Sequence, residues 1–285
     1  LTYFLAIANE ESITGACQVL HVTQPTVSRQ ISDLEKDLGV VLFERGPRKI
    51  TLTKEGLLFK RRAEEILSLI NKTEKEIVQD SEELEGTIIL GGGELRSVDF
   101  LSEKMAEFQK RHPKVFFEFQ TTTSDIIKEQ MDKGLLDMGL LLEPIEIDRY
   151  NYFRIPVKEI WCAMVSDKSK LANKKRIKPA DLINEKFILP RRNNIKNELS
   201  SWLGTDITKL NIVAAHNLNS NSAVMVSKGL GTSLCIETDM IKYFPGIKVI
   251  PLEPELSART VVAWKKNIPM NTATEKFMEF LVSWK

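Results

Sequence analysis

Apolar residues recur at helical spacing through the first forty residues and predict three short amphipathic helices. Their apolar positions, taken helix by helix, are Phe4, Leu5 and Ala8, then Ile13, Ala16, Cys17 and Leu20, then Val27, Ile31, Leu34 and Leu38. Ser12 and Thr23 are suited to cap the second and third helices, because their oxygens can accept from the first free backbone N–H groups. Gly39 is suited to end the third helix in a left-handed conformation.

The pattern changes after Gly39. Val41–Phe43 is an apolar run, Ile50–Thr53 alternates between apolar and polar residues, and Gly46-Pro47 lies between them. Two short strands joined by a Gly-Pro turn predict a β-hairpin. The turn is basic, and an arginine at the tip of such a hairpin can enter the minor groove of DNA.

The third predicted helix has a polar face opposite its apolar stripe. This face is made up of Gln24, Thr26, Ser28, Arg29 and Ser32. Gln and Arg side chains can form paired hydrogen bonds to adenine and guanine edges, and hydroxyl side chains suit phosphates or bases. A polar face alone is common on surface helices. Two helices joined by a short turn, the second of them with such a face at its start, are typical of a helix-turn-helix.

Four segments of this region resemble the winged helix-turn-helix of LysR-type transcriptional regulators: Thr23–Ile31, Leu34–Gly39, Leu42–Arg45 and Leu52–Gly56. The resemblance implies a minor-groove role for Arg48 and a major-groove role for four residues of the third helix, namely Gln24, Pro25, Ser28 and Arg29. The Gly46-Pro47 turn departs from the usual polar turn of the family and is stiffer. The whole set expected at DNA is Gln24, Pro25, Thr26, Ser28, Arg29, Ser32, Arg45, Arg48 and Lys49.

Leu57–Glu85 contains no glycine or proline and predicts one long helix. Its apolar positions alternate in steps of four and three residues, which is typical of a coiled coil. The residues expected to contact a second subunit are Phe59, Ala63, Ile66, Ile70 and Ile77. The alternative is a helix that packs against its own domain. Dimerisation is favoured because a helix-turn-helix that reads a palindrome needs a partner, and in the resembled family this helix pairs two subunits.

From Gly86 onward, apolar runs alternate with amphipathic segments. The expected strands are 87–90, 115–120, 135–142, 187–189, 212–215 and 232–235, and the expected helices are 98–111, 124–133, 195–203 and 220–227. This alternation is typical of βαβ units, so we expect a parallel sheet with helices on both faces. In such folds ligands bind at the carboxyl ends of the strands.

The second region resembles the effector domain of LysR-type regulators in Phe108–Pro113, Gly134–Leu140 and Gly229–Gly231. The resemblance implies a fold like that of periplasmic binding proteins, with two α/β subdomains, a ligand cleft between them, and crossings of the chain near Trp161 and Trp264. The expected fold class is therefore α/β overall, with a winged helix-turn-helix, a long linker helix and a two-subdomain effector domain. The expected boundaries are 1–58, 59–86 and 87–285, with subdomain I at 87–160 and 265–285 and subdomain II at 161–264.

Candidate cleft residues follow the expected strands. Thr122–Ser124 end a strand and open a helix, so their hydroxyl and N–H groups suit a carboxylate, and a simple cap at Ser124 is the alternative. Where the family often offers hydroxyls, this chain has Gly93, Leu95 and Arg96, and Arg96 points to an anionic effector. For Arg191 and its neighbours a solvated loop is an open alternative. The whole expected set is Gly93, Leu95, Arg96, Thr122, Thr123, Ser124, Arg191, Asn193, His216 and Asn217.

The 285 residues carry a formal net charge of +1, which by itself argues against a nucleic-acid partner. The net charge conceals a local excess of positive charge. From Arg45 to Arg62 there are seven basic residues and a single acid, Glu55. Such an edge suits DNA phosphates, and a solvated charged face is the alternative. The sequence has no membrane-spanning stretch and no signal-peptide pattern. Its three cysteines fit no metal or disulfide spacing, so we expect a cytoplasmic protein in a reducing compartment.

Motifs for catalysis or cofactor binding are absent from the sequence. Gly91-Gly92-Gly93 lacks the spacing of a nucleotide-binding loop, and the three histidines are too scattered to form a metal site. We therefore predict a sequence-specific DNA-binding transcriptional regulator that is not an enzyme, uses no cofactor or metal, and responds to a small-molecule effector. Its expected partners are double-stranded operator DNA, the effector and a second copy of the chain, and the resemblance implies a homotetramer. The alternative is a small-molecule-binding protein or metabolic enzyme whose N-terminal part is an interaction module.

Overall fold

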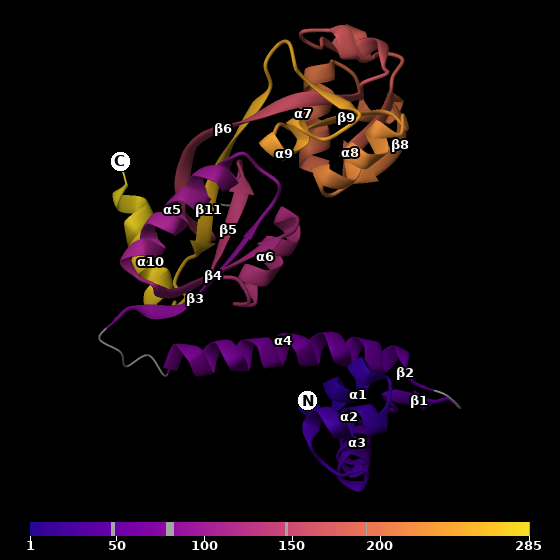
Figure 1. Cartoon of the computed structure of the whole chain (residues 1–285), viewed down its shortest axis with the longest axis vertical. Helices are drawn as coiled ribbons and strands as arrows, with labels where there is room; N and C mark the ends of the chain where they lie inside the picture. Colours follow the sequence, from indigo (N-terminus) through magenta and orange to yellow (C-terminus); the bar gives the residue numbers. More distant parts are fainter. Residues whose placement is uncertain (47–48, 78–82, 146–147, 192, 285) are drawn as a thin grey trace. The chain divides into compact units, whose positions relative to one another are not determined.

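The computed structural model describes residues 1–46, 49–77, 83–145, 148–191 and 193–284, and for residues 45, 72, 75–77, 193 and 194 it describes the backbone alone. The chain divides into two compact units, Leu1–Gln79 and Asp80–Lys285 (Figure 1). No helix among the described residues is long and apolar enough to cross a membrane.

Three helices form the body of the N-terminal unit. They are α1 (Thr2–Glu10), α2 (Ile13–Leu20) and α3 (Gln24–Leu38). Their shared core contains Phe4, Ile7, Ala16, Val27 and Ile31. These residues are apolar positions that the helical spacing predicted, apart from Ile7. Leu38, predicted to be buried, is 44% exposed because it lies at the C-terminal end of α3, beyond the helices that cover the rest of its stripe.

The helix ends follow the sequence closely. The Ser12 hydroxyl accepts a hydrogen bond from the Gly15 N–H at 3.2 Å, as expected of an N-cap. Gly39 ends α3 with φ of 69°, a left-handed conformation that glycine adopts without strain. Thr23 occupies the N-cap position of α3, but its hydroxyl pairs with that of Thr26 at 2.9 Å instead of with the helix backbone.

A short hairpin follows α3. Its strands are β1 (Phe43–Arg45) and β2 (Ile50–Leu52), which pair antiparallel. The predicted first strand began at Val41, yet Val41 is 60% exposed and lies outside the ladder. The reason is Glu35 on α3, whose carboxylate accepts the N–H groups of Leu42 and Phe43 at 2.6 and 3.2 Å. This contact ties the start of the hairpin to α3.

The long helix α4 spans Lys54–Ile77. The prediction that it continues to Glu85 is wrong, because Glu85 is the first residue of a strand. Near its start α4 packs against its own unit: Ala63 is fully buried, and the rings of Phe59 and Phe4 meet edge to face at 4.8 Å. Phe59 and Ala63 therefore pack in the N-terminal core.

The second unit contains two α/β halves. The first has strands β3 (Glu85–Gly92), β4 (Lys114–Thr121), β5 (Met138–Leu142) and β11 (Ser257–Lys265), with helices α5 (Ser97–Arg111), α6 (Ser124–Asp132) and α10 (Thr272–Ser283). The second has strands β7 (Lys186–Pro190), β8 (Asn211–His216), β9 (Thr232–Ile236) and β10 (Ile247–Pro251), with helices α7 (Asn193–Leu203), α8 (Asn219–Ser227) and α9 (Asp239–Lys242). Every strand and helix predicted from 87 onward matches one of these within a few residues.

Helices cover both faces of the sheet in each half, as predicted (Figure 1). In the first half, α5 and α10 contribute Phe100, Phe108 and Phe277 to one core, and α6 contributes Ile127 to the core on the other side. The second half also has two cores, one with Leu199 of α7, the other with residues of α8 and α9.

One long strand, β6 (Tyr150–Ser166), runs through both halves. It pairs antiparallel with β11 in the first half and with β9 and β10 in the second. The predicted parallel pairing is present within the βαβ units, β3 with β4 and β5, and β7 with β8 and β9, and the strands β6, β10 and β11, which were not predicted, add antiparallel pairs. Trp161 lies on β6 where its partner changes, whereas Trp264 pairs with Asn151 inside the first half, so β11 enters that half before Trp264.

Close packing accounts for the glycines that end β3. A Cβ atom on Gly92 would lie 2.5 Å from the Phe119 ring, and one on Gly91 would lie 2.6 Å from Leu136. Such contacts are too short for any side chain. The run of glycines thus lets neighbouring side chains approach the strand.

We predict that Phe4→Ala lowers the free energy of unfolding of the N-terminal unit by about 3–5 kcal/mol. Phe4 is fully buried, and its ring meets those of Phe43 and Phe59 at 4.9 and 4.8 Å, so truncation leaves a cavity. Amide hydrogen exchange of α1–α3 in the full-length protein measures the loss. Val19→Ala, at a position 58% exposed, is the control, and equal protection in the two variants would contradict the prediction.

Candidate DNA-binding and effector-binding sites

The expected DNA-reading face lies on the first turns of α3. Gln24, Pro25, Thr26, Arg29 and Ser32 are exposed, and Ser28 is half-buried. The Arg29 side chain is 83% exposed, and its guanidinium lies 3.8 Å from the Asp33 carboxylate one turn later. An exposed ion pair of this kind contributes little and can give way to a better partner. The fold therefore presents these side chains together on the surface of the unit.

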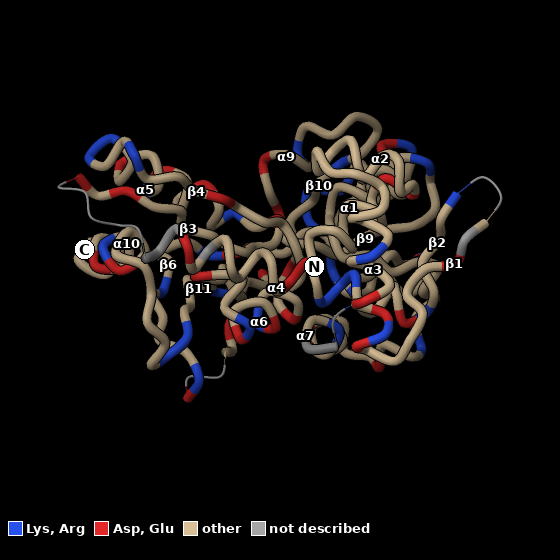
Figure 2. The backbone as a smooth tube through the Cα atoms, turned by 90° about the horizontal axis from the view of Figure 1, so that it is seen from below, with Lys and Arg blue, Asp and Glu red and all other residues tan. Residues whose placement is uncertain are grey.

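The hairpin carries the remaining residues expected at DNA. Lys49 pairs with Glu11 at 3.0 Å, and both side chains are more than half exposed. The carbonyl of Lys49 also accepts the Gly46 N–H at 3.0 Å, which closes the turn. Arg48 and the side chain of Arg45 lie outside the described residues. Lys49 directly precedes strand β2, which Figure 2 labels.

Beyond its packed start, α4 has an uncovered apolar face. Ile66, Leu69 and Ile70 are 46%, 42% and 43% exposed in this unit. The side chain of Ile77 lies outside the described residues. Large aliphatic side chains grouped on one helix face and left half in water favour contact with another surface.

The second unit contains a cavity of about 630 Å³ between its two halves. Its walls come from the ends of β3, β4 and β5 on one side and from the ends of β7, β8 and β9 on the other. These are the carboxyl ends of the strands, where α/β folds bind ligands. The volume is within the range of small-molecule sites.

Most of the residues expected at the cleft line this cavity. They are Gly93, Leu95, Thr122, Thr123, Ser124, Arg191, His216 and Asn217. Arg96 is not among the lining residues, and the side chain of Asn193 lies outside the described residues. The lining residues that sequence reasoning missed are Glu94, Asp125, Ile126, Leu142, Trp161, Pro190, Ile195, Ala215, Asn219, Cys235 and Ile236. Most of them lie within two positions of a predicted residue, so the ends of the predicted strands located the cavity better than residue type did.

The N-terminus of α5 is occupied by a carboxylate of the protein itself. Glu159, on β6, is fully buried and accepts the backbone N–H groups of Arg96 and Ser97 at 2.8 and 3.0 Å. The Thr260 hydroxyl of β11 donates a third hydrogen bond at 2.8 Å. A helix N-terminus attracts negative charge, and here Glu159 supplies it. Arg96 therefore contributes its backbone to an internal site.

The start of α6 differs from the expected cap. Its N-cap is Thr123, and Ser124 is already the first helical residue, so the alternative of a simple cap at Ser124 is wrong. The Thr123 hydroxyl accepts no hydrogen bond from the helix backbone. Thr122 is fixed by its N–H, which donates to the Gly92 carbonyl at 2.9 Å. These residues place hydroxyl groups on one wall of the cavity.

Glu94 connects the two halves across the cavity. It follows β3, and its Oε2 accepts the backbone N–H of Ser220 at 3.1 Å. Ser220 lies in the first turn of α8, so the carboxylate is also near the positive end of that helix. The contact joins residues 126 positions apart in the chain. The sequence offered one signal for it, an acid where the family often has hydroxyls.

His216 is buried in the wall next to Glu94. Its Nδ1 lies 3.1 Å from the Leu218 carbonyl, which can only accept, so Nδ1 carries a proton. Its Nε2 lies 3.4 Å from the Ser233 hydroxyl. Burial lowers the pKa of His216 below its usual 6.5, and the nearby Glu94 carboxylate opposes this effect without reversing it.

Two further wall residues have polar atoms of note. The indole N–H of Trp161 is buried and has no hydrogen-bond partner among the described residues. Cys235 faces Cys162 across β9 and β6, with the two sulfur atoms 3.7 Å apart and both cysteines free. The hydrogen bond with Cys235, together with burial, raises the pKa of the Cys162 thiol well above its usual value. A raised pKa keeps this thiol protonated and unreactive. Because Cys162 and Cys235 lie far apart in the sequence, their proximity could not be predicted from it.

Metal chemistry has no support in the described residues, which contain no group of three or more His, Cys, Asp or Glu placed to hold an ion.

Comparison with known proteins agrees with both parts of the chain. Residues 1–57 match the model of the bacterial regulatory helix-turn-helix protein, lysR family, and residues 81–285 match that of the LysR substrate binding domain. The chain is 30% identical over 254 residues to the HTH-type transcriptional regulator YtlI of Bacillus subtilis, a match that covers 87% of this chain and 80% of that protein.

Solved structures share the fold. Full-length CbnR complexed with its target DNA has a TM-score of 0.76 at 20% identity, over 99% of this chain and 97% of that one. The effector binding domain of QuiR in complex with shikimate has a TM-score of 0.62 at 18% identity, over 70% of this chain and 96% of that one.

A winged helix-turn-helix joined to an α/β domain with a cavity between its halves defines a DNA-binding regulator with an effector-binding domain. The chain belongs to the LysR family of transcriptional regulators. The family is one of regulators and not of enzymes, so the predicted class is confirmed and the metabolic-enzyme alternative is not favoured.

The lowered pKa of His216 predicts a pH dependence of stability. Below about pH 6.5 the unfolded chain takes up a proton at this residue that the folded chain refuses, so the stabilisation is present above that pH and is lost as pH falls through it. Replacing His216 with Gln should therefore flatten the fall in unfolding free energy between pH 7.5 and 5.5, by at most about 1.4 kcal/mol per pH unit. Urea unfolding at a series of pH values measures this, with His21→Gln as the exposed control. Parallel profiles for wild type and His216→Gln would contradict it.

Proposed function

We propose that this chain binds an operator through the first turns of α3 and that a small molecule in the cavity of the second unit controls the binding. The observation that carries the proposal is the presence on one chain of an exposed reading face at α3 and a cavity of about 630 Å³ at converging strand ends. The family membership supports both halves of this statement.

In the proposed complex the N-terminal turns of α3 enter the major groove. Gln24 and Arg29 have side chains that pair with adenine and guanine edges, and Pro25 stiffens the first turn. The hydroxyls of Thr26, Ser28 and Ser32 contact phosphates or bases. Arg45 and Lys49 belong to the hairpin. The minor-groove contact proposed for Arg48, which lies outside the described residues, rests on the family resemblance. Likeness of fold to CbnR, which was solved at full length with its target DNA, supports this docking.

A homodimer completes the proposed DNA-binding form. The uncovered face of α4, with Ile66, Leu69 and Ile70, is the contact surface that supports it. Two copies paired along this face present two α3 helices, as a palindromic operator requires. A homotetramer built from such dimers is a further expectation, which rests on resemblance.

The effector acts through linkage. A molecule that binds one arrangement of the two halves more tightly than another shifts the population toward that arrangement, by no more than its difference in affinity. The shift changes the spacing of the DNA-binding units in the oligomer. Hydroxyls of Thr122–Ser124 offer such a molecule polar contacts, and QuiR, a neighbour in fold, was solved with shikimate in its effector binding domain.

We predict that Arg29→Ala weakens binding to the specific operator by about 1–3 kcal/mol and weakens non-specific binding less. The physical reason is loss of a paired hydrogen bond to a base edge. Gel-shift titrations on the protein's own upstream DNA and on scrambled DNA measure both affinities. Arg29→Lys, which keeps the charge without the planar fork, should lose specific binding while retaining non-specific binding. Equal losses on both DNAs would remove the base-reading role.

We predict that Ile66→Asp and Ile70→Asp each shift the protein toward monomer, because pairing would bury an unpartnered carboxylate. Sedimentation of the full-length chain measures the mass. Val19→Asp makes the same kind of change at an exposed apolar position on α2 and should leave the mass unaltered. An unchanged mass for the two α4 variants would exclude this face as the subunit contact.

A further inference from the structure

The charges around the cavity do not match an anionic effector. Among the described lining residues the acids are Glu94 and Asp125 and the basic residue is Arg191; Asp125 and Arg191 are both exposed, and Glu94 is half-buried. Arg96, the residue that pointed to an anion, has its backbone committed to Glu159 and is not among the lining residues. An anion entering this space would meet carboxylates of its own sign.

The helix ends near the cavity are also satisfied by the protein. Glu159 occupies the N-terminus of α5, and Glu94 accepts from the first turn of α8. Each supplies the negative charge that a ligand carboxylate would otherwise bring. Two of the positive sites that an α/β cleft usually offers an anion are therefore already filled.

Glu94 has unused capacity to accept hydrogen bonds. A carboxylate can accept about four, and from the described residues Glu94 accepts one, from Ser220 at 3.1 Å. Within the described residues it takes part in no ion pair, and its half-buried side chain borders the cavity. His216 beside it has both ring nitrogens engaged, one with the Leu218 carbonyl and one with the Ser233 hydroxyl. A positively charged donor is the natural complement of such a group, since charge-assisted hydrogen bonds are the strong ones.

We infer that the effector carries a protonated amino group, which binds the Glu94 carboxylate. The inference rests on the proposed function, in which this cavity is the effector site. Amines and amino acids share this chemistry. Ile126, Leu142, Trp161, Ile195 and Ile236 form apolar walls for a carbon skeleton. In an amino acid the carboxylate has as a partner the Thr123 hydroxyl at the start of α6, which makes no cap hydrogen bond with the helix.

Three probes on one skeleton test the charge preference: phenethylamine has the amino group, hydrocinnamate has the carboxylate, and L-phenylalanine has both. Calorimetric titration of the full-length protein should show binding of the two amino compounds at least tenfold tighter than that of hydrocinnamate. Phenethylamine and L-phenylalanine together distinguish a simple amine from an amino acid. Tighter binding of hydrocinnamate, or no binding of either amino compound up to millimolar concentration, would overturn the inference.

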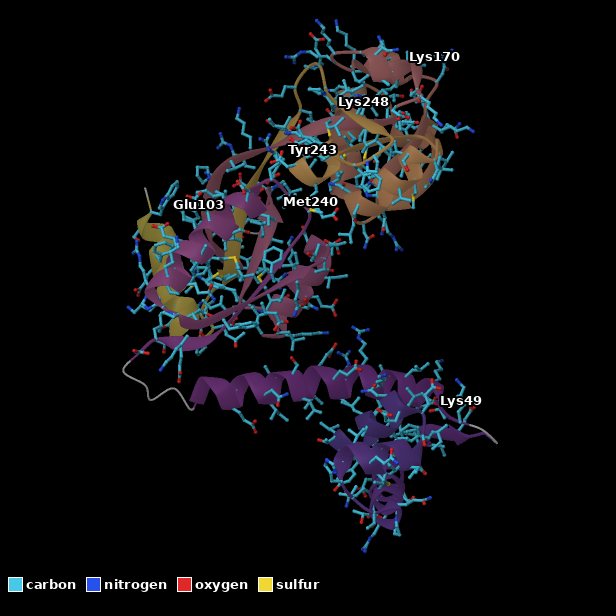
Figure 3. All side chains as sticks on the ribbon, in the orientation of Figure 1. Lys49, Glu103, Lys170, Met240, Tyr243 and Lys248 are labelled. Carbon is cyan, nitrogen blue, oxygen red and sulfur yellow. The ribbon has the colours of Figure 1, made fainter. Side chains whose placement is uncertain are left out.

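Glu94→Gln isolates the carboxylate, because the amide oxygen can still accept the Ser220 N–H while the charge is lost. Binding of the amino compounds should fall at least tenfold, and binding of hydrocinnamate should stay equal or become tighter. Glu103→Gln, an exposed acid on α5 labelled in Figure 3, is the matched control and should change neither. Thermal unfolding and circular dichroism of Glu94→Gln verify that it is folded. Amine binding that survives Glu94→Gln would also overturn the inference.

One more variant separates this inference from the proposed function. Ala215→Trp places a large side chain in the cavity wall and should abolish binding of every probe. If probes bind but are unaffected by Ala215→Trp, the cavity is not their site, and the proposed function fails together with the inference. If hydrocinnamate binds in the cavity and the amines do not, the effector site stands and the amino-group inference alone is wrong.

Discussion

The antiparallel pairing of β6 with β11 is the constraint on which the cavity depends. The two strands carry the chain between the halves of the second unit, and they pair from Ser257 with Ile160 to Lys265 with Tyr150. Glu159 fixes this crossing from within, because its buried carboxylate binds α5 and Thr260 of β11 together. A buried charge is tolerated only when it is well hydrogen-bonded, and three donors satisfy it here. The loop with Glu94 and Leu95 immediately precedes α5, so its position at the cavity follows from the same anchor.

Local structure was readable from the sequence because it depends on neighbours along the chain. The helices of the first unit and the βαβ units of the second show regular apolar spacing, with caps such as Ser12 and Gly39 in place. The crossing strands were missed for a physical reason. In the first half of β6 the buried residues are separated by exposed ones, whereas in the second half nearly every residue is buried. No single spacing of apolar residues therefore describes the whole strand. Its role is set by distant partners, β9 and β11, which periodicity cannot report.

The same limit explains the mixed outcome for α4 and for the candidate cleft. An apolar stripe says that a helix face will be covered but does not say by what. Phe59 and Ala63 are covered by their own unit, while Ile66 and Ile70 are not. At the cleft, strand ends correctly located Thr122–Ser124 and His216. Arg96 was chosen for its charge, yet its backbone N–H decided its role, because a buried carboxylate competes for free helix donors more strongly than solvent does.

Positive and negative charges are concentrated at different sites of this chain, and the net charge of +1 does not reveal this distribution. The basic residues of the hairpin and of the start of α4 can contact DNA phosphates. At the cavity, the carboxylate of Glu94 determines which sign of ligand charge is favoured. Because Glu94 already bridges the halves through Ser220, a ligand that complements its charge adds to this link, whereas a ligand of like charge must compete with it. The two kinds of ligand would therefore bias the halves in opposite directions. The sign of the effector and the direction of the conformational response are coupled through one carboxylate.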